Sequence, residues 1–303
     1  MDRTKIVACL SAGLLAGLPT GLLVVSLAGC SGPARIVVGS KNFSEQVLLG
    51  EILAQQIERR LGISVERKLN LGGTLLAQGA LVNGSIDLYP EYTGTALTAI
   101  LKQSPLQDPG AVLGAVRAAY QQRWKLRWLA PLGFNNTFAM IVRGETARGA
   151  KIETLADAAR SQTWRMGVGY EFKQRPDGLD GLLAAYGLRT DGDPVTMDLG
   201  LLYTALQSRK VDIIAANSTD GQASVLDVKM LQDNRHYFPP YECAVVVRED
   251  TLARFPQLRE ALEQLSGKLP DSVMRKLNYA VDGQHRDPAQ VASEFLHTAL
   301  EAH

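Results

Sequence analysis

From Ile36 onward, short apolar runs alternate with longer segments of helical periodicity, and this alternation most limits the folds that the sequence can adopt. Seven runs have the length and residue types of β-strands. They are Arg35 to Gly39, Ser64 to Lys68, Ile86 to Tyr89, Thr137 to Val142, Trp164 to Val168, Val211 to Ala216 and Cys243 to Val247. The pattern predicts an α/β protein.

Between these runs, apolar residues recur at intervals of three and four, as in helices that turn one face to a core. The segment Ser44 to Leu61 has this pattern, and we expect Ser44 to cap its N-terminus. The other predicted helices are Leu75 to Val82, Thr93 to Lys102, Ala111 to Arg123, Leu155 to Ser161, Gly178 to Tyr186 and Leu201 to Ser208.

The length of 303 residues suggests two domains, although no linker rich in Pro, Gly or Ser divides the chain. Two lobes joined by strands that cross between them reconcile these facts, and Leu132 to Val142 and Phe238 to Val247 are candidate crossings. We therefore expect one lobe of residues 30–136 plus 242–303, a second lobe of residues 137–241, and a ligand cleft between them.

The first thirty residues have the pattern of an export signal. Arg3 and Lys5 precede an apolar run from Ile6 to Leu27, and Leu27-Ala28-Gly29-Cys30 follows. A transmembrane anchor is the alternative, because about 20 apolar residues can span a bilayer. The small residues before Cys30 favour cleavage, and the stretch resembles a bacterial lipoprotein signal peptide, residues 1–29, with lipidation at Cys30. The expected location is periplasmic or at the cell surface, with the membrane contacted through the lipid anchor only.

Composition and motifs argue against several classes of function. A net charge of +1 gives no electrostatic footprint for nucleic acid, and three Cys with four His form neither a disulfide framework nor a zinc motif. The sequence lacks the nucleophile elbow, the phosphate loop and a complete dinucleotide fingerprint. We therefore expect no cofactor, no metal and no catalytic residues; the alternative is a hydrolase that uses His236 or Asp220.

Loops that combine aromatic residues with a few charged or amide groups follow several predicted strands. Ser40 to Phe43, Tyr89 to Thr95 and Asn217 to Gly221 are such loops, and Gly133 to Phe138, of the same composition, begins a strand. Aromatic faces attract alkylated ammonium groups, and Lys41 and Arg175 supply cations for a carboxylate. The loops indicate a small zwitterion with an alkylated cation.

At these motifs the chain resembles the substrate-binding proteins of bacterial ABC importers for glycine betaine, choline and related osmoprotectants. The motifs lie in the family's order over nearly the whole mature chain. They are Ser40-Lys41-Asn42-Phe43 with Glu45-Gln46, Leu69 to Thr74, Asp87 to Thr95, Gly133 to Thr137, Arg175 to Gly178, Ser218 to Gly221 and Phe238 to Tyr241.

The resemblance implies a two-lobed periplasmic-binding-protein fold of type II that closes on its ligand. By motif, Tyr92 and Tyr241 are expected in an aromatic cage, and Lys41, Thr95 and Arg175 at the carboxylate. The full set of expected ligand-binding residues is Lys41, Tyr92, Thr95, Asn136, Phe138, Arg175, Asn217 and Tyr241. The expected partners are an ABC permease and a separate ATPase subunit, with the binding protein itself a monomer.

Two positions depart from the family's pattern. Phe138 and Asn217 stand where betaine binders often have cage tyrosines, and the loss of one aromatic face forfeits about 0.5 to 2 kcal/mol. The hypotheses are therefore a betaine receptor of reduced affinity, or a receptor for choline, ergothioneine, another histidine betaine or a larger amine. A binding domain that signals or scaffolds without transport is the further alternative.

Overall fold

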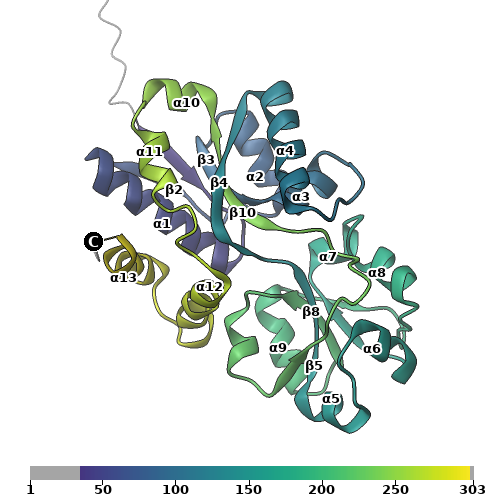
Figure 1. Cartoon of the computed structure of the whole chain (residues 1–303). Coiled ribbons are helices and arrows are strands. Elements are labelled where there is room, and N and C mark those ends of the chain that lie inside the picture. The colour runs from purple at the N-terminus through teal and green to yellow at the C-terminus, as the bar shows by residue number, and fades with distance from the viewer. Residues whose placement is uncertain (1–34, 301–303) are drawn as a thin grey trace, which may run out of the picture. The chain divides into compact units, whose positions relative to one another are not determined.

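The computed structural model describes residues 35–300, so the predicted signal peptide and Cys30 lie outside the described residues. The strands of this part form two mixed sheets (Figure 1). The first sheet, in the order β2-β1-β3-β10-β4, contains β1 (Ile36–Gly39), β2 (Val65–Lys68), β3 (Leu88–Tyr92), β4 (Leu126–Asn135) and β10 (Glu242–Arg248). The second, in the order β7-β6-β8-β5-β9, contains β5 (Phe138–Arg143), β6 (Met166–Val168), β7 (Val195–Thr196), β8 (Ile213–Asn217) and β9 (Val228–Met230).

Both sheets have the same mixed pairing. In the first, β1 pairs in parallel with β2 and β3, whereas β10 is antiparallel to β3 and β4. In the second, β6 pairs in parallel with β7 and β8, whereas β5 is antiparallel to β8 and β9. Each sheet with its helices is a lobe, called here the first lobe and the second lobe.

Helices fill most of the segments between the strands. Those of the first half are α1 (Ser44–Leu61), α2 (Thr74–Val82), α3 (Thr93–Thr95), the π-helix η1 (Ala96–Ile100), α4 (Pro109–Trp124), α5 (Gly144–Ala150) and α6 (Leu155–Ser161). Those of the second half are α7 (Tyr170–Gln174), α8 (Leu179–Tyr186), α9 (Leu199–Gln207), the 3-10 helix η2 (Gly221–Ser224), α10 (Glu249–Arg254), α11 (Leu258–Glu263), α12 (Asp271–Asn278), the π-helix η3 (Tyr279–Gly283) and α13 (Pro288–Leu300). Within residues 35–300, none of these helices is long and apolar enough to cross a membrane.

Alternate residues of the central strands face different cores, because side chains of a strand point to opposite sides of its sheet. In β10, Val245 and Val247 join a core with α1 and α13, whereas Ala244 and Val246 join one with α2 and α4. In β5, Ile141 faces α9, and its neighbours face α6 and α8. Both faces of each sheet are therefore covered by helices.

The chain passes between the sheets at two places that determine the position of the site. β4 ends at Asn135 and β5 begins at Phe138, and the return runs from the end of β9 to the start of β10 (Figure 1). Gly94 allows the second crossing to pack closely, since a Cβ there would lie 2.7 Å from the carbonyl oxygen of Pro240. A side chain at residue 94 would force this crossing away from α3.

The sequence located α1 and α6 to the residue but missed β4, β7 and β9 as separate strands. The single extended crossing expected from Leu132 to Val142 is two strands, one in each sheet. Ser44 does not cap α1: Phe43 is the N-cap residue, with no side-chain hydrogen bond, and Ser44 is the first helical residue. The helix ends at Gly62, whose φ of 67° is the left-handed conformation that glycine adopts readily.

Candidate ligand-binding site

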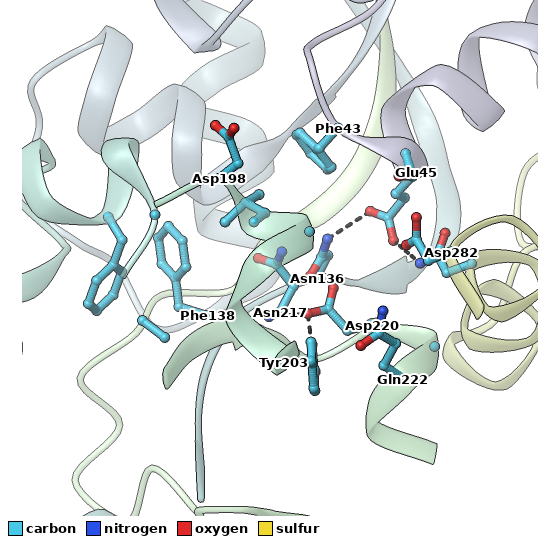
Figure 2. A pocket seen from close by; sticks show the side chains of 18 of the residues that line it. Phe43, Glu45, Asn136, Phe138, Asp198, Tyr203, Asn217, Asp220, Gln222 and Asp282 are labelled. Carbon is cyan, nitrogen blue, oxygen red and sulfur yellow. Dashed lines mark hydrogen bonds between the residues drawn. The ribbon is translucent and has the colours of Figure 1, made fainter. Parts of the chain in front are cut away.

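One large cavity is lined by residues of both lobes and of the C-terminal segment (Figure 2). Its volume is about 910 Å³, near the upper end of the range of about 300 to 1,000 Å³ for small-molecule pockets. The structure brings all the sequence-predicted ligand-binding residues to its wall: Lys41, Tyr92, Thr95, Asn136, Phe138, Arg175, Asn217 and Tyr241. His236, the alternative general base, is exposed and does not line this cavity.

Lys41 enters the cavity wall from the loop between β1 and α1. Its Nζ lies 2.5 Å from Glu91 Oε1 and 3.3 Å from Thr74 Oγ1, and 4.8 Å from the centre of the Tyr92 ring. Both members of the ion pair are buried, so each charge is stabilised mainly by the other. An ammonium group has three N–H donors, and these two hydrogen bonds use two of them.

Arg175 follows α7 and forms a buried fork with Asp177. Its Nε and Nη2 donate to the two Asp177 oxygens at 2.8 and 2.5 Å, and Nη1 donates to Thr95 of the first lobe at 2.9 Å. Burial tends to raise the pKa of Asp177, but the hydrogen bonds and charge of Arg175 hold that pKa below its usual value. The guanidinium is thus fixed in orientation by its own chain before any ligand arrives.

Aromatic rings surround these cations. The guanidinium of Arg175 lies 5.0 Å from the centre of the Phe138 ring and 5.6 Å from that of Tyr241. Tyr92 and Tyr241 are only 5% and 2% exposed, whereas Phe138 is half-buried and Tyr170 is 56% exposed. The ring surfaces most open to a ligand are therefore those of Tyr170 and the half-buried Phe43, Phe138 and Tyr279, rather than those of the two expected cage tyrosines.

Glu45, in the first turn of α1, joins distant parts of the wall. Its Oε1 accepts hydrogen bonds from the Tyr92 hydroxyl at 2.6 Å and from Asn136 Nδ2 at 2.7 Å. Its Oε2 accepts from Thr219 Oγ1 at 2.6 Å and from Asn278 Nδ2 at 2.7 Å. Burial, with the nearby charge of Glu45, raises the pKa of Tyr92 well above its usual value, so its hydroxyl remains a donor.

Two further carboxyl groups lie near Glu45 (Figure 2). Asp220 Oδ2 accepts from the Asn217 backbone N–H at 3.1 Å and from the Tyr203 hydroxyl at 3.2 Å. Burial, together with the negative charges of Glu45 and Asp282, raises the pKa of Asp220 to about 7. Burial also raises the pKa of Asp282. This end of the cavity is rich in hydrogen-bond acceptors.

Hydrogen bonds connect the two lobes around the cavity. Glu171 of α7 accepts from the backbone N–H of Thr74 at 2.5 Å and from its hydroxyl at 3.1 Å. Because Gly73, the N-cap residue of α2, has no side chain to cap the helix, Glu171 of the other lobe satisfies the first orphan N–H. Asp177 also accepts from Thr98 Oγ1 at 2.8 Å, and this bond joins the lobes together with those of Arg175 to Thr95 and of Thr219 to Glu45.

Several wall residues are absent from the predicted set. Phe43 and Glu45 lie in the first motif, and they could have been predicted as wall residues because an aromatic ring and a carboxylate follow the first predicted strand. Asn278 and Asp282 gave none, because they lie far along the chain in α12 and η3, outside any motif. Only tertiary structure brings them to the cavity.

Two mixed sheets of matching strand order, with a cavity between them, define a solute-binding protein of the two-lobed type II class. Residues 34–298 match the OpuAC family model, the substrate-binding domain of ABC-type glycine betaine transport systems, and the chain belongs to this family. The family is one of transporter substrate-binding proteins, which act outside the cytoplasm, and is not an enzyme family.

Relatives in this family carry different ligand names. The carnitine transport binding protein OpuCC of Listeria monocytogenes is 33% identical over 276 residues, 89% of each chain. The ergothioneine transport permease/ergothioneine binding protein EgtU of Helicobacter pylori is 35% identical over 86% of this chain and 47% of its own. A crystal structure of a glycine betaine/carnitine/choline ABC transporter, 33% identical, superposes with a TM-score of 0.75 over 87% of this chain and 98% of the other.

Proposed function

We propose that this protein captures a small quaternary-ammonium zwitterion outside the cytoplasm and delivers it to an ABC permease. The observation that carries the proposal is the placement of Arg175 beside the rings of Phe138 and Tyr241 and the hydroxyl of Thr95, in the cavity between the lobes. A carboxylate beside this guanidinium would leave the alkylated cation of the same ligand near the open aromatic faces.

The proposed site for the ligand's carboxylate consists of N–H donors of Arg175 and Lys41 that take part in no hydrogen bond within the described part of the protein. Arg175 has five N–H groups, and its bonds to Asp177, Thr95 and Thr98 use four of them. Lys41 retains one beyond Glu91 and Thr74. A ligand carboxylate can accept from both, and the internal pairs keep the two donors in place.

The same arrangement supports closure on the ligand. The lobes, 30–136 plus 242–303 and 137–241, each contribute groups to the proposed site, so a ligand that contacts both favours the closed arrangement. We propose that the permease recognises this closed form and that residues 1–29 and a lipidated Cys30 keep the protein at the membrane. No bond is made or broken in this process.

The test is calorimetric titration of the full chain, purified in detergent, with glycine betaine, choline and carnitine. Binding of glycine betaine at micromolar concentration supports the proposal. Preference for choline, which has no carboxylate, contradicts the carboxylate end. A ligand other than betaine is favoured by Asn217, which lies opposite Phe138 in the β5–β8 pairing and offers an amide in place of a ring.

A further inference from the structure

The solvent-facing side of α2 is apolar. Leu75, Leu76 and Val82 are 66%, 65% and 39% exposed, whereas Ala77 and Leu81 on the opposite side are buried in a core of the first lobe. Residues 69–86, which include the whole helix, contain no charged residue. The solvent face of a surface helix is normally polar, so an exposed apolar face of this kind is typical of an interaction site.

The second lobe also exposes apolar side chains. Tyr170 at the start of α7 is 56% exposed, and Leu199 and Leu201 in the first turn of α9 are 37% and 55% exposed. Tyr170 and Leu199 also line the cavity, so they lie at its rim. A Cβ at Gly169 would lie 2.6 Å from Leu199 Cδ2, which shows that the beginnings of α7 and α9 pack together.

A contact between the lobes joins these two apolar groups. The helix α2 belongs to the first lobe, and α7 and α9 belong to the second (Figure 1). Glu171 accepts hydrogen bonds from the backbone N–H and the hydroxyl of Thr74, at 2.5 and 3.1 Å. Thr74 directly precedes Leu75, and Glu171 directly follows Tyr170. A surface made of both groups therefore exists only while the lobes are held together.

The location of the chain limits the partner that can cover this surface. The family is one of ABC transporter substrate-binding proteins, which implies a permease as partner. A lipid on Cys30, as proposed above, leaves only residues 31–34 before the described body, and such a segment spans at most about 18 Å. The body is then held close to the bilayer, where a membrane-embedded partner is within reach.

We propose that the exposed apolar residues of both lobes form one docking surface, which binds an apolar extracytoplasmic face of the permease. The docking surface consists of Leu75, Leu76, Val82, Tyr170, Leu199 and Leu201. This inference rests on the proposed function, in which the permease recognises the closed form. It supplies a physical basis for that recognition, because separated lobes would present the two halves of the docking surface apart.

The first test is uptake of glycine betaine by the producing bacterium, which contains the full chain and its permease. Leu75→Asp and Leu201→Asp each place a carboxylate in one half of the docking surface, outside the cavity wall. Each should lower the initial uptake rate about 10-fold, because a charge without a partner is costly to bury in an apolar contact. Neither should change the affinity for glycine betaine in calorimetry.

Leu106→Asp is the matched control for uptake. Leu106 is 39% exposed and lies in neither α2 nor the second lobe, so this variant should transport at the wild-type rate. Wild-type rates of uptake in both Leu75→Asp and Leu201→Asp overturn the docking surface.

The second test identifies the partner directly. The photo-crosslinking amino acid p-benzoylphenylalanine is placed at residue 75, or at residue 106 as the control, in the same bacterium. We expect a crosslinked product from residue 75 that contains permease peptides in mass spectrometry, and none from residue 106. A product that joins two copies of this chain, or the absence of a product with the permease, overturns the proposal.

The results separate the docking surface from the proposed function. If the wild type binds and takes up glycine betaine and both Asp variants do so equally well, the docking surface fails and the proposed function stands. If the wild type neither binds nor takes up glycine betaine, choline or carnitine, the proposed ligand class fails. Crosslinking at residue 75 then decides the docking surface by itself.

Discussion

Glu45 Oε1 lies 2.7 Å from Asn136 Nδ2, so the first helix is hydrogen-bonded to the place where the chain first crosses between the sheets. Glu45 is buried and accepts three further hydrogen bonds, from Tyr92, Thr219 and Asn278. One carboxylate therefore connects the first lobe, the first crossing, the second lobe and the C-terminal segment. The following predictions test this arrangement and the groups around it.

Glu45→Gln should lower the free energy of unfolding by about 2 to 4 kcal/mol, because an amide NH2 would face donors that now meet a carboxylate oxygen. Denaturant unfolding measures the change. Glu260→Gln is the matched control, since Glu260 is exposed on α11. A loss of less than 1 kcal/mol in Glu45→Gln would show that the four hydrogen bonds contribute little.

Arg175→Met should destabilise the protein by about 3 to 5 kcal/mol, because it leaves the buried Asp177 carboxylate without its cation. The double variant Arg175→Met/Asp177→Asn should recover at least half of this loss, since the neutral amide oxygen can still accept from the hydroxyls of Tyr241 and Thr98. Unfolding of the four members of this mutant cycle is the measurement. No recovery in the double variant contradicts the role given to the buried charge.

The same pair predicts loss of stability in acid. The folded-state pKa of Asp177 lies below its ordinary value, so its contribution is present above that ordinary value and is lost as pH falls through the folded pKa. Wild-type unfolding between pH 6 and pH 2 should show this loss, and Asp177→Asn should reduce it. An unchanged acid dependence in Asp177→Asn would exclude this carboxyl as a cause.

The raised pKa of Asp220 predicts the opposite dependence of folding stability on pH. Its folded-state pKa of about 7 lies above its ordinary value, so its contribution to stability is fully present below about pH 4 and is lost as pH rises through 7. Asp220→Asn mimics the protonated form, so its stability relative to wild type should increase by about 2 to 4 kcal/mol as pH rises from 4 to 8, with little difference at pH 4. The groups that face Asp220 are Glu45, Asp282 and Tyr203, and unfolding at several pH values tests the shift.

Asn217→Tyr should raise glycine betaine affinity about 2- to 30-fold, because it adds an aromatic face opposite Phe138. Calorimetry on the full chain measures it. Phe138→Tyr is the comparison variant, which keeps the ring and adds only a hydroxyl; its effect should be smaller. A weaker affinity in Asn217→Tyr would mean that the amide itself contacts the ligand.

Cys30→Ala should release the protein from the membrane fraction of the producing bacterium, because lipidation at this residue is the proposed anchor. Cys9→Ala, within the predicted signal, is the matched control and should leave the protein in that fraction. Fractionation and intact-mass analysis provide the measurement. Retention of Cys30→Ala at the membrane would favour an uncleaved apolar helix.

The sequence by itself determined the α/β class, the bounds of α1 and α6, and the eight predicted residues that the structure places around one cavity. The class and the helix bounds follow from the spacing of apolar residues, whereas the eight residues follow from the motifs that the chain shares with its family. It did not separate β4 from β5, because both are extended and only two residues, Asn136 and Thr137, lie between them.

Only the tertiary structure decided how the wall's polar groups are paired. Lys41 and Arg175 are bound to Glu91 and Asp177, and the sequence offered no sign that these cations were already neutralised. It also gave no reason to place Asn278 beside Glu45, 233 residues away in the chain. Local sequence patterns indicate which chemical groups a loop contains. Hydrogen bonds between residues far apart in the chain, such as Glu45 and Asn278, depend on how both sheets and the C-terminal helices pack.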